Sequence, residues 1–171
     1  MNMTGERVML RPICTEDADI LCAWKNDEQT YMYLGGGYQP VSREQYGKWM
    51  ENMIDQTGNS RRFIIQTSAC EPIGMVGLYE IHWIHRTCEI GMLIGSAEHR
   101  GKGLASEAYT LIEAYAKNYL NLRKIRLKAV CDNEAAVAFW QKQGYRPVGV
   151  LHRERYINGK YCDVALMEKF L

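Results

Sequence analysis

Residues 100–105, with the sequence RGKGLA, combine two cations and two glycines with the start of a predicted helix. The first N–H groups of a helix lack partners inside the helix, and the helix dipole adds partial positive charge there. Glycines also let the backbone approach a ligand, because no Cβ stands in the way. The turn therefore favours a phosphate or pyrophosphate ligand. An ordinary strand-to-helix turn with solvated cations would show the same residues, and short glycine motifs recur by chance.

Cysteine and histidine are scattered along the chain. The 6 cysteines contain no C-x-x-C pair, and the 4 histidines form no H-E-x-x-H pattern. A disulfide scaffold and a metal site are therefore not expected. The pattern instead predicts a location in the reducing cytoplasm.

Length and composition predict one globular domain. The chain has 171 residues, of which 47% are hydrophobic and 24% are charged, and its net charge is +1. This balance argues against a nucleic-acid partner, which normally requires a basic excess. No apolar run reaches the length of a signal peptide or of a membrane-spanning helix, so no membrane partner is expected.

Hydrophobic periodicity assigns the elements that position the turn. Strands are predicted at residues 7–13, 63–65, 72–83, 87–95, 124–130, 148–151 and 163–167, with a hairpin at 156–161. Helices are predicted from Thr15 as cap to Asn26, from Ser42 to about Gly58, from Gly103 to Asn118, and from Asn133 as cap to Gln143. A glycine-rich and aromatic loop, residues 31–40, connects the first two helices.

This order predicts an α/β chain with a mixed sheet and helices on its faces. In such sheets ligands bind at the carboxyl ends of strands, beside helix starts. Both the turn at 100–105 and Asn133 lie at such a place. The last strand, residues 163–167, is expected to be exposed and able to pair with a second copy in a homodimer.

Two motifs carry a family resemblance. The turn fits the pattern Arg/Gln-x-x-Gly-x-Gly/Ala, and a second segment supplies Asn133, Ala136, Phe139-Trp140 and Gly144-Tyr145. At this spacing the chain resembles the GNAT superfamily of acyl-CoA-dependent N-acetyltransferases over its whole length. The resemblance implies a single N-acetyltransferase domain, residues 1–171, with a twisted, mostly antiparallel mixed sheet of about seven strands and helices on both faces.

The resemblance also implies acetyl-CoA as co-substrate and no metal. The backbone of the turn would hold the pyrophosphate, a strand would pair with the pantetheine arm, and Asn133 would bind that arm near its thiol end. The residues implied in cofactor binding are Met92, Leu93, Ile94, Arg100, Gly101, Lys102, Gly103, Leu104, Ala105, Asn133, Ala136, Phe139 and Trp140. The strand would be buried in any fold, and Asn133 is a good helix cap in its own right.

Acetyl transfer to an amine requires a base, because an amine with a pKa of about 10.4 is protonated at neutral pH. Glu89 is the first candidate, since it opens the strand expected to carry the thioester and matches a position where relatives carry glutamate. Glu80, on the adjoining strand, is the second candidate. A solvent-facing glutamate at a strand end is the alternative interpretation.

Trp140 departs from the family pattern. Many relatives place a tyrosine there as an acid for the departing thiolate, and an indole N–H is not a usable acid. Tyr145, Tyr109 or water could replace it, or Trp140 could simply pack on the pantetheine arm or in the core.

The amine acceptor stays open at this point. The segments HWIHRTCEI and YINGKY resemble spermidine/spermine acetyltransferases, but residues 34–37 are Leu-Gly-Gly-Gly where those proteins carry acidic residues. Residues 24–27 and 42–44 also resemble ribosomal-protein and amino-sugar acetyltransferases. A protein N-terminus, an amino sugar, a small amine and a polyamine are all candidates. A non-catalytic acyl-CoA sensor and a plain nucleotide-binding domain are the alternatives from other classes.

Overall fold

A computed structural model describes residues 3–171. Its single sheet has eight strands in the order β1-β2-β3-β4-β5-β6-β8-β7. The strands are β1 (Met3–Thr4), β2 (Val8–Pro12), β3 (Arg61–Thr67), β4 (Pro72–His82), β5 (Thr87–Ile94), β6 (Lys124–Val130), β7 (Arg146–Ile157) and β8 (Lys160–Phe170). The helices are α1 (Ala18–Lys25), α2 (Glu28–Tyr31), α3 (Arg43–Ile54), α4 (Leu104–Asn118) and α5 (Glu134–Lys142), with 3-10 turns at Thr15–Asp17 and Ala97–His99.

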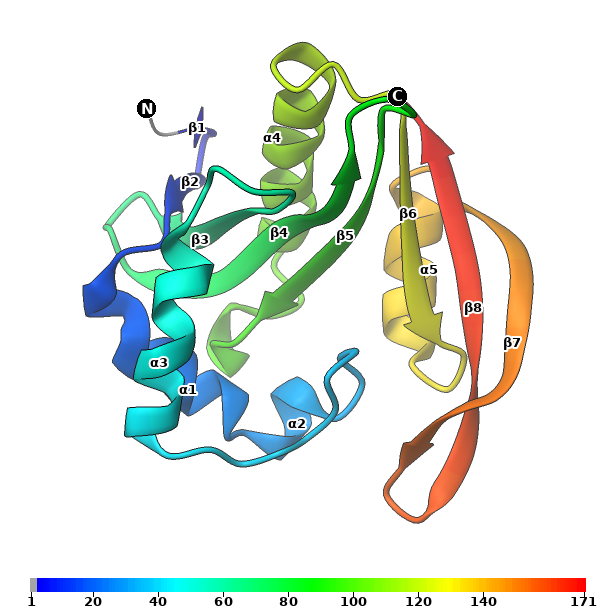
Figure 1. Ribbon diagram of the computed structural model, residues 1–171, viewed down its shortest axis with the longest axis horizontal. Helices are drawn as coiled ribbons and strands as arrows, with labels where there is room; N and C mark the ends of the chain where they lie inside the picture. The colour runs from blue at the N-terminus through cyan, green and yellow to red at the C-terminus, as the bar shows by residue number, and fades with distance from the viewer. Residues whose placement is uncertain (1–2) are drawn as a thin grey trace.

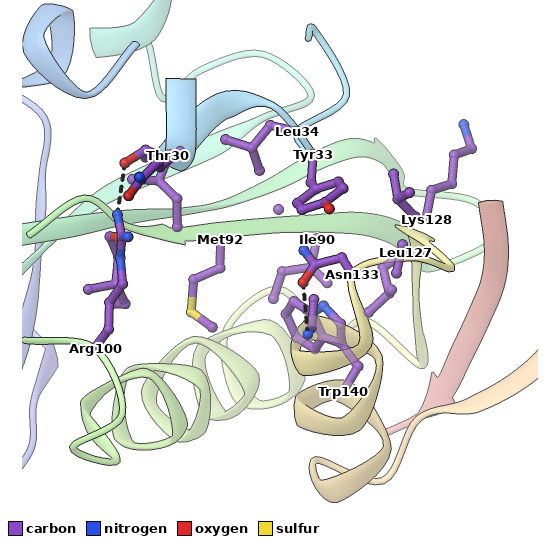
Figure 2. Close-up of a pocket in the computed structure, with 17 residues that line it drawn as sticks. Thr30, Tyr33, Leu34, Ile90, Met92, Arg100, Leu127, Lys128, Asn133 and Trp140 are labelled. Carbon is purple, nitrogen blue, oxygen red and sulfur yellow. Dashed lines mark hydrogen bonds between the residues drawn. The ribbon is translucent and has the colours of Figure 1, made fainter. Parts of the chain in front are cut away.

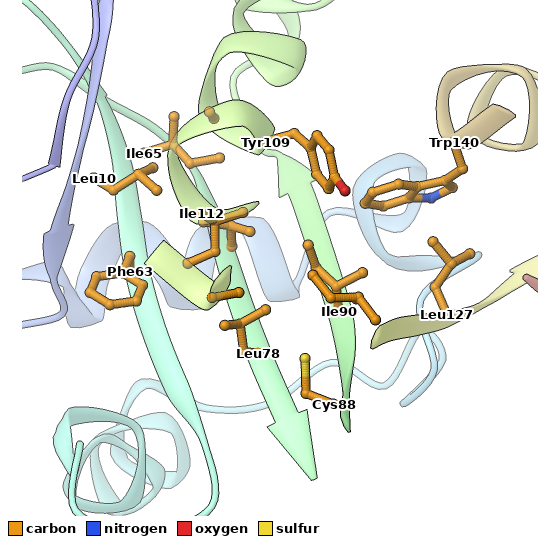
Figure 3. Close-up of a cluster of buried hydrophobic side chains, with 14 of the residues drawn as sticks. Leu10, Phe63, Ile65, Leu78, Cys88, Ile90, Tyr109, Ile112, Leu127 and Trp140 are labelled. Carbon is orange, nitrogen blue, oxygen red and sulfur yellow. The ribbon is translucent and has the colours of Figure 1, made fainter. Parts of the chain in front are cut away.

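The helices cover both faces of the sheet (Figure 1). One face carries α1 and α3, whose buried side chains pack with Ile64 of β3. The opposite face carries α4 and α5, and the largest core cluster joins these helices to strands from β2 to β8. In Figure 3, Tyr109 of α4 and Trp140 of α5 lie over the same part of this core. The predicted mixed sheet with helices on both faces is confirmed.

The sheet parts between β5 and β6. This pair is the one parallel contact among the described strands, and it runs only from Thr87↔Lys124 to Glu89↔Arg126. Beyond Glu89 the two strands diverge, as Figure 1 shows. The second half of β5 therefore has a strand neighbour, β4, on one side only.

Glycine permits a close backbone approach on the β4 side of β5. A Cβ on Gly74 would lie 2.2 Å from the carbonyl oxygen of Leu93, so no larger residue fits there without a shift. Further along β4 the register shifts between Tyr79 and His82, and Glu80 has a φ of 49°. This bulge moves Glu80 out of the regular ladder.

Several predicted elements differ from the observed ones. The last strand is not at an edge: β8 lies between β6 and β7, so the expectation that this strand is exposed and able to pair with a second copy is wrong. Strand β7 is longer than the predicted 148–151 because β8 pairs with it almost throughout, despite two register shifts. Helix α2, for which no helix was predicted, forms between the predicted end of the first helix at Asn26 and the predicted loop at 31–40, with Asp27 as its cap. Thr15 does not cap the first helix, since Cys14 precedes the turn there and the Asp17 carboxylate accepts the Cys14 N–H.

Candidate active site

The gap between β5 and β6 forms a cavity of about 350 Å³ (Figure 2). The second half of β5, residues 90–94, forms one wall and residues 127–130 of β6 form the other. Asn133 and Trp140 lie at the α5 side, and Thr30 and Tyr33 come from α2 and the loop after it. Because β5 lacks a neighbouring strand here, an extended ligand with amide groups fits along its open edge. We call this cavity the cofactor cleft, after the ligand that the sequence predicts for it. The predicted residues Met92, Leu93 and Ile94 all line it.

The glycine turn lies at the start of α4. Gly101 and Gly103 have φ values of 71° and 79°, a conformation that glycine adopts without steric cost. Within residues 3–171, no backbone or side-chain acceptor binds the N–H groups of residues 101–106. A row of free N–H groups at a helix start fits a diphosphate.

Arg100 differs from the other residues of the turn. Its N–H donates to the Ala97 carbonyl over 3.2 Å, so this group is not free for a phosphate. Its guanidinium donates to the carbonyl of Ile94 at 3.0 Å and to the hydroxyl of Thr30 at 2.8 Å. Figure 2 shows this side chain bridging the end of β5 to α2. Arg100 therefore joins the turn to the elements that cover the cleft.

Asn133 caps α5, as predicted. Its side-chain oxygen accepts the N–H of Ala136 over 3.3 Å. The side-chain amide can then donate to a ligand, because Asn133 and Ala136 both line the cofactor cleft. Phe139 is not among the lining residues: it packs against the main core, with its ring 4.9 Å from that of Trp140.

Trp140 is both a core residue and a wall of the cleft. Only 7% of it is exposed, and its ring packs edge-to-face against Tyr109 and Tyr145 at centroid distances of 5.7 and 5.3 Å. The two tyrosines are buried behind it and do not line the cleft. Burial raises the pKa of both phenols, and the Tyr109 hydroxyl donates to Glu113 at 3.0 Å. Neither phenol is placed to protonate a thiolate in the cleft.

A second cavity, of about 400 Å³, adjoins the first across β5. The two cavities share residues 90–93 of β5 as a common wall, together with Tyr33, Leu34 and Lys128. Tyr31 and Tyr79 add aromatic surface to the second cavity, which we call the acceptor cavity. A group in the cleft and a group in the acceptor cavity can therefore meet beside the same stretch of β5.

Both predicted acids line the acceptor cavity. Glu89 is the less exposed, with 26% of its side chain accessible, and its Oε2 atom lies 3.7 Å from Nζ of Lys128. Glu80 is more exposed, at 72%, and its carboxylate lies 3.9 Å from Arg126. The structure thus brings the two carboxylates to one cavity and places Glu89 nearer the shared wall.

Sequence reasoning missed two charged residues of this cavity, Lys128 and Arg155. Lys128 alternates with buried residues in β6, and no role in a site was predicted for it. Arg155 lies near the end of the long β7, and its Nη1 donates to the carbonyl of Tyr33 at 2.8 Å. Alternation along a strand tells which face a side chain takes, but the sequence did not place a cavity on that face.

An open strand edge beside a helix start with free amides fits an extended ligand that carries a diphosphate. The family model described as an acetyltransferase (GNAT) domain matches residues 7–146. The chain therefore belongs to the GNAT acetyltransferase family, and it is an acetyl-CoA-dependent N-acetyltransferase that acts on an amine. The free amides of the turn and the open edge of β5 fit this co-substrate.

Relatives with a named activity are similar over most of the chain. A spermidine N(1)-acetyltransferase of Escherichia coli (strain K12) is 33% identical over 164 residues, which are 96% of this chain and 86% of that protein. One from Vibrio cholerae is 38% identical over 107 residues, which are 63% of this chain and 61% of that protein. The crystal structure of a Vibrio cholerae spermidine N-acetyltransferase with CoA and spermine has a TM-score of 0.88 and 30% identity, and covers 95% of both chains.

No helix within residues 3–171 is long and apolar enough to cross a membrane.

Proposed function

We propose that this enzyme acetylates a primary amine of a small molecule held in the acceptor cavity, with Glu89 as the general base. The observation that carries the proposal is the wall of β5 that both cavities share, with Glu89 at its start. Acetyl-CoA supplies the activated acetyl group. An amine in the acceptor cavity would reach the cleft beside the Glu89 carboxylate, which would take the proton of the ammonium directly or through one water.

The remaining residues divide between holding the co-substrate and stabilising charge. In this proposal the N–H groups of residues 101–105 hold the pyrophosphate and Asn133 donates to the pantetheine arm. A backbone N–H of β5 would stabilise negative charge on the carbonyl oxygen. Since Trp140 cannot act as an acid, and since Tyr109 and Tyr145 are buried outside the cleft lining, the thiolate would take its proton from water or from the Tyr33 phenol, which lines the cleft. Glu80 is the second candidate base.

Spermidine is the reference acceptor for the first assay, because two relatives are named for it. A peptide with a free N-terminus, an aminoglycoside and a nucleotide amino sugar complete the panel. Self-association of the chain stays a prediction, supported by the dodecameric structure of one Vibrio cholerae relative.

The test of the base is Glu89→Gln. Loss of the base should lower kcat/KM for the amine by about a hundredfold, with the KM for acetyl-CoA little changed. The same substitution at Glu80 tests the second candidate base and should cost much less, because Glu80 is more exposed and lies off the regular ladder. Full turnover by Glu89→Gln at every pH would remove the assignment.

Thiol release separates transfer from simple binding. Release of CoA that requires an amine supports the proposal. Binding of acetyl-CoA without thiol release by any amine would contradict it and would favour an acyl-CoA sensor.

A further inference from the structure

The acceptor cavity carries balanced charges. Its lining includes two acids, Glu80 and Glu89, and two cations, Lys128 and Arg155. A cavity for a polycation would need an excess of acids, because like charges in a partly enclosed site disfavour binding.

The pairing of these charges leaves one cation over. Glu89 faces Lys128 at 3.7 Å, and Glu80 faces Arg126 at 3.9 Å. Among residues 3–171, no carboxylate lies within ion-pair distance of Arg155. Each acid of the cavity thus has a cationic neighbour, whereas the charge of Arg155 is not compensated.

Arg155 is also fixed in position. Its Nη1 donates to the Tyr33 carbonyl at 2.8 Å, which ties the guanidinium to the loop that covers the cavity. Its Nη2 has no acceptor in the part of the chain that the structure describes. That nitrogen lies 3.6 Å from the point where a Cβ on Gly35 would stand, and Gly35 and Gly36 both line the cavity. The glycines therefore leave the free nitrogen accessible to a ligand.

We infer that the acceptor amine also carries an anionic group, a carboxylate or a phosphate, which Arg155 binds while the amine faces Glu89. This inference rests on the proposed function, since it names the class of acceptor for the same cavity. A fixed guanidinium with a free N–H pair suits both anions. It would repel the second and third charges of a polyamine, so the acceptor differs in class from the one for which the relatives are named.

Matched amines that differ in one group test the inference. The first pair is 4-aminobutyrate and putrescine, which present a carboxylate or an ammonium on the same carbon chain. The second pair is glucosamine 6-phosphate and glucosamine, and spermidine is the reference. We measure kcat/KM for acetyl transfer and, separately, the dissociation constant of each amine by calorimetry with CoA present. The anionic member should be favoured by at least about tenfold in one pair, and that pair identifies the anion.

Substitutions assign the preference to Arg155. Arg155→Gln should abolish the preference, and Arg155→Lys should keep part of it. Arg153→Gln, an exposed arginine of the same strand outside the cavity lining, should leave it intact. Loosening of the loop alone would lower both members of a pair equally, so the ratio separates anion binding from a structural role.

The outcomes distinguish the two proposals. Preference for the anionic member that is lost in Arg155→Gln supports the inference. Preference for putrescine or spermidine overturns it and leaves acetyl transfer intact. If no amine is acetylated, acetyl transfer as proposed fails, and the calorimetric ratio alone then supports or overturns the anion site.

Discussion

Asp17 shows how a single charged residue supports the elements around the site. Only 4% of it is exposed, and its carboxylate accepts from both terminal nitrogens of Arg11, at 2.7 and 2.6 Å, and from the Cys14 N–H. Burial by itself would raise the pKa of Asp17, but these hydrogen bonds hold the pKa below its ordinary value. The contacts join β2 to the start of α1, the helix that precedes α2 and the loop beside the acceptor cavity.

We predict that Asp17→Asn lowers the free energy of unfolding by about 3 kcal/mol at neutral pH, because it leaves a partly buried arginine without its partner. A lowered folded-state pKa gives stability that is complete above the unfolded pKa of about 3.9 and is lost as pH falls through the folded pKa. The difference from wild type should therefore shrink below about pH 4 in urea titrations. Asp19→Asn, at an exposed pair with Arg43, is the control and should cost less than about 1 kcal/mol. A difference that grew towards acid would contradict the assignment.

For individual residues, the sequence predicted side-chain contacts to the nearby backbone better than contacts between side chains that are distant in the sequence. Asn133 was predicted as a cap and is one, because a cap depends on residues three positions apart. The ion pairs of Glu89 with Lys128 and of Glu80 with Arg126 depend on strands that are distant in sequence or on a bulge. Trp140 could be interpreted as core or as cleft, and the structure places it at the boundary of both.

The role of the turn before α4 in binding CoA can be tested against a second glycine that has the same backbone conformation. Gly101 has a φ of 71° and Gly159, in the distant β7–β8 hairpin, has a φ of 84°. A Cβ at either position would meet nothing within 4 Å. Alanine at each should cost about 1 kcal/mol of stability, because both positions have the left-handed conformation.

Only Gly101→Ala should also weaken CoA, since its Cβ would stand where the phosphates approach the free N–H groups. We expect about a tenfold higher dissociation constant for CoA, measured by calorimetry. Gly159→Ala should bind CoA as wild type does. Equal CoA affinity for the two variants would mean that the turn does not hold the diphosphate.

The order of helices and strands was predictable because hydrophobic periodicity and the cap and turn residues that end each element are local features of the sequence. The helix at 103–118 and the strand at 124–130 lie within a residue of their predicted bounds. Short or irregular elements were not predictable: α2 has four residues, too few for a periodic signal, and β1 has two. The length of β7 depends on its partner β8 rather than on its own alternation, which the register shifts interrupt.

The sheet that runs through the whole molecule has two parts, strands β1 to β5 and strands β6 to β8. The two parts meet only where β5 pairs with β6, a contact that we call the seam. The parallel pairing of β5 with β6 covers three residue pairs, and at the same closed end Arg86 donates to the Asn121 carbonyl at 2.6 Å. Past the seam, the cofactor cleft separates residues 90–94 from residues 127–130. No local sequence pattern predicts this divergence, because it depends on where the pairing of two strands that are distant in sequence ends.

A ligand that fills the gap should therefore join the two parts. We predict that CoA at a hundredfold excess over its dissociation constant stabilises the fold by about 2.7 kcal/mol and raises Tm by about 5–10 °C. Hydrogen exchange should slow at residues 90–94 and at 127–130 together, because the pantetheine arm would lie along the open edge of β5. ADP, which carries the diphosphate without that arm, should slow exchange only near residues 100–106. Protection by CoA confined to the turn would show that the arm does not lie between the strands, and the acetyl group would then have to reach the amine by another route.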